Sequence, residues 1–182
     1  MRLVASIPLL TGQTLGRISG ATPFAAGFQA SAPGEATRGV TLPRFEEYPS
    51  TRLFTGRPAP ALVDSAPYGR MYRTRLRQGS SEGPNFDGAF TVVVWGCGSN
   101  CQVVAVVDAK TGNLSEQTLR TTNGVAFRRD SRLLIADPVH AGDPPLDTCA
   151  ACGVPAAYEW NGSRFEPVGS GPHPHPFGDR PW

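Results

Sequence analysis

The chain has 182 residues and a formal net charge of only +2, so it offers no electrostatic basis for binding nucleic acid or an anionic membrane surface. Its length suits one domain with a hydrophobic core, and no stretch approaches the roughly 18 to 20 consecutive apolar residues that would span a bilayer. The 21 glycines and 18 prolines concentrate toward the two ends, which indicates loops there. We therefore expect a single β-rich domain over residues 41–168, preceded by a poorly structured leader or linker (1–40) and followed by a proline-rich tail (169–182).

The leader has some features of an export signal. A basic start at Arg2 precedes the short apolar run 3–10, and 30–32 has the small residues of a cleavage site, although Arg17 interrupts the segment. Together with the cysteines, these features lead us to expect a periplasmic or extracellular bacterial protein.

Prolines and aromatic residues mark the beginning of the domain. The prolines exclude a helix interior, so we expect an extended segment held on the domain by four side chains: Phe45, Tyr48, Leu53 and Phe54.

A short helix is predicted next. Residues 64–67 offer a capping side chain followed by proline, and Gly79 offers a stop. An apolar stripe at helical spacing consists of Tyr68, Met71, Tyr72 and Leu76. The alternative is a strand across residues 72–77, but the two caps favour the helix.

One face of this helix carries three basic residues, Arg70, Arg73 and Arg77. Together with Trp95 they form a possible interaction face that could hold an acidic partner, although such a row is more often solvated.

Residues 86–108 predict the central β-hairpin, because two β-branched and aromatic runs flank a glycine-containing tip. A third strand is expected near 114–119, followed by short strands at 124–128 and 132–137. A second hairpin is expected over 158–168, with Asn161-Gly162 as a two-residue turn. The predicted fold is therefore mainly β (α+β), an antiparallel meander, curled sheet or small sandwich of about six to eight strands with one short helix.

The residues most able to form covalent bonds or to bind a metal are the four cysteines, Cys97, Cys101, Cys149 and Cys152. Local pairing, 97 with 101 and 149 with 152, suits an exported protein and is favoured. We expect the first bond to close the hairpin tip, because three intervening residues bring the two Cα atoms within disulfide reach. A four-cysteine zinc site and a redox-active 149–152 pair remain as alternatives.

No catalytic set is evident in the sequence. His140 has Asp137, Asp143 and Asp147 nearby, which could build a metal site or a general base, but an Asp-rich loop with Pro and Gly is usually a solvated connection. Neither a nucleophile elbow nor a phosphate-binding glycine loop is present. We expect no enzyme activity and no cofactor, with zinc as the alternative.

Six segments of the core form a pattern: Phe45–Pro49, Tyr72–Leu76, Gly83–Gly88, Trp95–Gln102, Val107–Gly112 and Asp130–Ile135. This pattern resembles a family of uncharacterised bacterial proteins, mostly exported to the periplasm or cell surface. The resemblance covers residues 45 to about 168 and departs from the family pattern at Ala89-Phe90, where a His-Tyr pair is frequent. It implies location and architecture but no chemistry.

These observations lead to one functional expectation. We expect a non-enzymatic extracytoplasmic domain that binds a protein partner or serves as an accessory subunit of an envelope assembly. The competing hypothesis is a zinc-binding or thiol-redox protein that uses the four cysteines.

Overall fold

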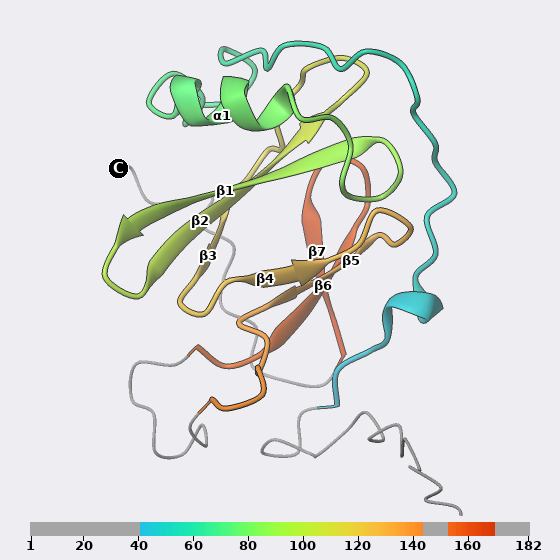
Figure 1. The fold of residues 1–182 in the computed structure, drawn as a ribbon, viewed down its shortest axis with the longest axis vertical. Coiled ribbons are helices and arrows are strands. Elements are labelled where there is room, and N and C mark those ends of the chain that lie inside the picture. Colours follow the sequence, from blue (N-terminus) through green and yellow to red (C-terminus); the bar gives the residue numbers. More distant parts are fainter. Residues whose placement is uncertain (1–40, 144–152, 170–182) are drawn as a thin grey trace, which may run out of the picture. The chain divides into compact units, whose positions relative to one another are not determined.

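Two antiparallel sheets and one short α-helix form the part of the chain that this computed structural model describes, residues 41–143 and 153–169 (Figure 1). The first sheet has the order β1-β2-β3 and the second the order β4-β5-β6-β7. The helices are the 3-10 helix Phe45–Glu47 and α1 (Arg73–Ser80), and the strands are β1 (Phe90–Gly98), β2 (Cys101–Asp108), β3 (Leu119–Thr121), β4 (Val125–Phe127), β5 (Leu133–Ala136), β6 (Ala156–Trp160) and β7 (Phe165–Val168). The predicted mainly β fold with one short helix is confirmed. Within the described ranges, no helix is long and apolar enough to cross a membrane.

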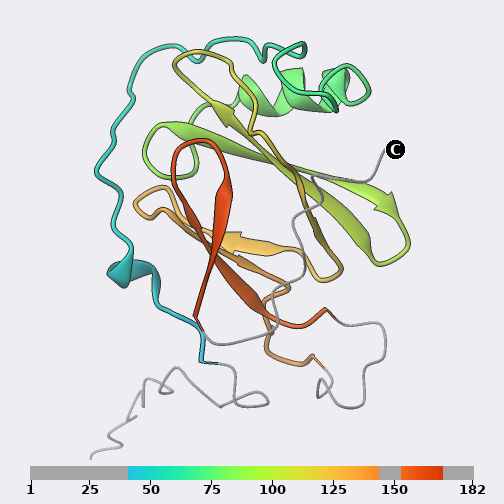
Figure 2. The ribbon, with the colours of Figure 1, turned by 180° about the vertical axis from the view of Figure 1, so that it is seen from behind.

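The β1–β2 hairpin is buried on both of its faces. Side chains on one face, including Val92 and Val104, join a core with Tyr158 and Trp160 of the second sheet. Side chains on the other face join a second core with Leu76 of α1; they are Val93, Trp95, Val103, Ala105 and Val107. Figures 1 and 2 accordingly show the hairpin between α1 and the four-stranded sheet. Continuous apolar runs in both strands fit this arrangement, because both faces are covered from Phe90 to Val93 in β1 and from Val103 to Val107 in β2.

Apart from the 3-10 helix Phe45–Glu47, the segment 41–60 runs extended along one side of the two sheets (Figure 1), as the prolines predicted. The Ser131 hydroxyl lies 3.0 and 2.8 Å from the carbonyl oxygens of Phe45 and Tyr48. Further along, Arg52 Nη1 donates to the buried Asp87 carboxylate over 2.8 Å. The prediction that Leu53 holds the segment in place was wrong, because its side chain is 77% exposed.

The helix exists but begins later than predicted. It spans Arg73–Ser80, and residues 63–72 form turns. Tertiary contacts account for the difference: the Tyr68 hydroxyl donates to the carbonyl oxygen of Ser115, and an added Cβ on Gly69 would lie 2.7 Å from the Leu114 side chain. Tyr68, Tyr72 and Leu76 do pack together against the hairpin, whereas Met71 is 60% exposed. Gly79 lies inside the helix, where an added Cβ would meet Val93 at 2.7 Å.

Two strand predictions needed adjustment. The third strand is Leu119–Thr121, and Leu114 makes only an isolated bridge to Val107. The 158–168 hairpin is present, but its loop has four residues, because Trp160 pairs with Phe165. The Asn161 side chain accepts the amides of Ser163 and Arg164 and so closes this longer turn. The predicted leader over 1–40, the tail beyond residue 169 and the second cysteine pair lie outside the described residues.

Candidate binding edge at the hairpin tip

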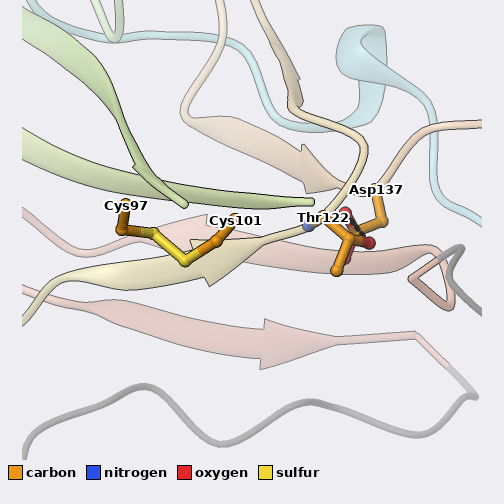
Figure 3. Close-up of a disulfide and its surroundings, with 4 residues drawn as sticks. All are labelled: Cys97, Cys101, Thr122 and Asp137. Carbon is orange, nitrogen blue, oxygen red and sulfur yellow. Dashed lines mark hydrogen bonds between the residues drawn. A yellow bond between two sulfur atoms is a disulfide. The ribbon is translucent and has the colours of Figure 1, made fainter. Parts of the chain in front are cut away.

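A disulfide closes the tip of the central hairpin. Cys97 and Cys101 are bonded, with their Cα atoms 5.1 Å apart, which confirms the predicted pairing (Figure 3). The register shifts at this point, since Gly96 pairs with Gln102 and Gly98 with Cys101, so Cys97 occupies a β-bulge. The bond therefore fixes the place where the β1–β2 ladder ends.

β1 is an edge strand of its sheet, because β2 is its only neighbour among the strands of the described residues. Ala109 N donates to Ala89 O, and the register continues from this pair through Thr91↔Val107 and Val93↔Ala105. In an antiparallel pair, hydrogen-bonded positions alternate with positions whose backbone groups face away. The N–H and C=O groups of the even-numbered residues, from Phe90 to Gly96, therefore point away from β2.

The first half of this outer edge is closed by residues that precede the strand. Phe90 N donates to Phe86 O, and Phe90 O accepts the amide of Phe86. At the next outward position, the Asn85 side chain makes the two hydrogen bonds that a neighbouring strand would make. Its Oδ1 accepts Val92 N at 2.8 Å, and its Nδ2 donates to Val92 O at 3.2 Å. Phe90 and Val92 thus have their outward groups satisfied within the chain.

The second half of the edge is open. Among residues 41–143 and 153–169, none hydrogen-bonds the outward backbone groups of Val94 and Gly96. Val94 is 40% exposed, and an added Cβ on Gly96 would meet nothing within 4 Å. Natural edge strands are usually protected by charges, proline or bulges. Here only the bulge at Cys97 limits the edge, because residues 88–107 contain no charged side chain.

An open depression of about 440 Å³ lies beside the hairpin tip. Val94 and Gly96 line one part of it, and the polar side chains of Asn100, Gln102 and Thr122 line another. The depression thus extends from β1 across β2 toward the end of β3, on the side of β1 that faces away from its outer edge.

The polar border of the depression is held by a buried carboxylate. Asp137 Oδ1 accepts hydrogen bonds from the backbone amide of Thr122 at 2.6 Å and from the Thr122 hydroxyl at 3.0 Å (Figure 3). The same oxygen accepts the backbone amide of Asn123 at 2.6 Å. The other carboxylate oxygen packs against Gly153, where an added Cβ would lie 2.1 Å from it. Asp137 therefore positions the turn that carries Thr122.

The sequence left open a metal site or a general base around His140, with Asp137, Asp143 and Asp147. The His140 backbone amide donates to Asp143 Oδ2, and the Asn123 side chain donates to the same oxygen. These hydrogen bonds hold the pKa of the Asp143 carboxyl below its usual value, and the bond from the His140 amide has the larger effect. No group of three or more metal-binding side chains occurs among the described residues; Asp147 lies outside them.

The structure separates Trp95 from the three arginines of the predicted interaction face, whereas Arg73 Nη1 donates to Arg70 O at 3.4 Å, so these two residues are neighbours. Arg70 precedes α1 and pairs with Asp64, whereas Arg73 and Arg77 are exposed on the helix itself. Trp95 is only 6% exposed and stacks on Tyr72, with ring centroids 4.6 Å apart. It is a core residue under the helix and offers no surface to a partner.

The zinc alternative requires four free thiolates. Cys97 and Cys101 are bonded to each other and cannot supply two of them in this state. Cys149 and Cys152 lie outside the described residues.

Sequence reasoning missed the open edge. Alternation along β1 could have separated Val94 and Gly96 from their neighbours, but the role of Asn85 depends on how the preceding loop folds back.

Comparison with models of protein families, with curated proteins and with solved structures gave no match. The geometry of the chain itself must therefore support any functional conclusion.

Proposed function

We propose that this chain is an extracytoplasmic binding domain that takes up an extended segment of a protein partner as an additional strand along β1. The observation that carries the proposal is the pair of outward-facing, unpaired backbone positions at Val94 and Gly96. Strand addition uses such main-chain groups for affinity and adjacent side-chain pockets for specificity. The exposed side chain of Val94 would supply an apolar contact beside these main-chain groups.

The disulfide supports a location outside the cytoplasm. Such bonds persist in oxidising compartments and are rare in the cytosol, where thiols are kept reduced. The Cys97–Cys101 bond also holds the tip in one conformation, which lowers the entropic cost of binding there. The proposal assigns no catalytic step to the chain and is compatible with an accessory role in an envelope assembly.

The test is a selection of short random peptides on the wild-type protein, followed by amide hydrogen exchange in the complex with the tightest peptide. We expect slower exchange at Val94 and Gly96 and no change at Val92, whose amide is already bonded to Asn85. Gly96→Pro removes one outward donor without removing a β1–β2 hydrogen bond, and it should abolish binding. Gly96→Ala keeps that donor and is the matched control. Peptides that bind Gly96→Pro as well as wild type would refute strand addition at this edge.

A further inference from the structure

We propose that the segment which fits this edge is β1 of a second copy, so that two chains pair edge to edge in a two-fold symmetric dimer. The proposal rests on the proposed function, since it uses the same edge and names the partner. The two three-stranded sheets would then form one continuous sheet with the order β3-β2-β1-β1-β2-β3.

Only one register uses all the open groups of both copies. An antiparallel pair that sets Val94 opposite Gly96 of the second copy also sets Gly96 opposite Val94 of the second copy, and both are hydrogen-bonded pairs. Setting Val94 against itself would align Gly96 with Val92, whose outward groups Asn85 already occupies. Setting Gly96 against itself would carry Val94 past the bulge at Cys97, where the ladder ends.

The side chains are compatible with this register. Directly opposite residues of an antiparallel pair project from the same face of the sheet. The exposed Val94 side chain would thus lie over Gly96 of the second copy, where space is open out to 4 Å from an added Cβ. The two-fold axis repeats this contact, so each copy covers the exposed valine of the other.

The charge distribution also permits self-pairing. A two-fold interface brings each residue close to the same surface patch of its partner, so a charged edge would face its own charge. Residues 88–107 carry no charged side chain, and the edge lacks the lysines and prolines that normally prevent such pairing. The paired segment is short, so we expect a weak dimer that dissociates on dilution.

Sedimentation velocity over a wide range of protein concentration tests the proposal. Wild type should shift from monomer to dimer as concentration rises, and the amides of Val94 and Gly96 should exchange more slowly in the dimer. Val94→Lys should remain monomeric throughout, because it sets a charge on the paired edge. Gln78→Lys adds the same charge to the exposed surface of α1 and should dimerise like wild type.

Two results would overturn self-pairing: a wild-type protein that stays monomeric at the highest concentration, or a Val94→Lys variant that dimerises as strongly as wild type. The failure of self-pairing remains distinct from that of strand addition. A monomeric wild type whose Val94 and Gly96 amides are protected by a selected peptide would remove only the second copy as partner. Protection by neither the peptide nor concentration would remove both proposals.

Discussion

Replacing Gly88 with alanine should strongly destabilise the fold, because two separate penalties meet at this residue. Its φ of +65° lies in the left-handed region, which costs other residues roughly 1 to 2 kcal/mol. An alanine Cβ would also lie 1.8 Å from the carbonyl oxygen of Arg52. Relieving that clash displaces the 41–60 segment and breaks hydrogen bonds of Gly88, with Phe54 N at 2.9 Å and with Arg129 O at 2.7 Å.

At about 1 kcal/mol for each of these hydrogen bonds, the expected loss for Gly88→Ala is about 3 to 4 kcal/mol of unfolding free energy. Two other glycines separate the contributions. Gly83 has φ of +88°, and an added Cβ would lie 3.8 Å from the nearest atom, so it would meet no clash. Gly83→Ala should therefore lose only the cost of the left-handed backbone conformation, about 1 to 2 kcal/mol. Gly96 has neither problem, and Gly96→Ala should be neutral or should stabilise by up to about 1 kcal/mol.

Urea unfolding followed by tryptophan fluorescence, at a concentration where the chain is monomeric, measures all three variants. The order of stability should be Gly96→Ala, then Gly83→Ala, then Gly88→Ala, with similar dependence on urea. If Gly88→Ala loses no more than Gly83→Ala, the close approach of Arg52 has no energetic consequence and the reasoning fails. An equal loss in Gly96→Ala would also refute the reasoning, because Gly96 has neither a positive φ nor a close neighbouring atom.

Three further predictions concern other parts of the fold. Replacing Cys97 and Cys101 together by serine should lower the unfolding free energy by about 2 kcal/mol, because the closed loop is small, and should speed amide exchange at the tip while the far-UV spectrum is kept. Burial raises the pKa of Tyr68 to about 12 and, with a contribution from the Asp137 carboxylate, that of Tyr158 to about 12, against about 10 in an unfolded chain. The folded state therefore holds these two protons more tightly, so their contribution to stability is complete below about pH 10 and is lost as the pH rises toward 12. Absorbance at 295 nm should show two tyrosine ionisations at high pH, and Tyr68→Phe and Tyr158→Phe should each remove one of them. Ser131→Ala should cost about 2 to 3 kcal/mol, since the buried hydroxyl contacts two carbonyl oxygens and accepts an amide, and it should open the 41–60 segment to proteolysis before the domain unfolds.

The hairpin and its disulfide were predictable because their signals are local. Residues 90–95 and 103–107 are β-branched or apolar, and the cysteine spacing permits one bond across the turn between them. The start of the helix was not predictable, because the capping pattern at 64–67 competes with the hydrogen bond between Tyr68 and Ser115, 47 residues apart in the chain.

The candidate site depended even more on tertiary structure. Whether a strand has a free edge depends on strand order, and whether that edge is open depends on Asn85, a loop residue that satisfies Val92. Trp95 and the arginines looked alike as surface residues in the sequence. Alternation along β1 instead places Trp95 on the same face as Val93, where both are buried with Leu76 of α1.

A hairpin covered on both faces also has a particular history during synthesis. The layer on one face, with Tyr68 and Leu76, leaves the ribosome before the hairpin, whereas Tyr158 and Phe165 on the other face follow it. At about 5 to 20 residues per second, the chain needs about 3 to 11 seconds to extend from residue 108 to residue 165. During that interval one apolar face of the uncharged hairpin, residues 88–107, is uncovered in the nascent chain. We therefore expect the yield of the protein in cells to depend on chaperones that shield this face, and to be more sensitive to pauses in translation after residue 108 than to pauses before residue 90.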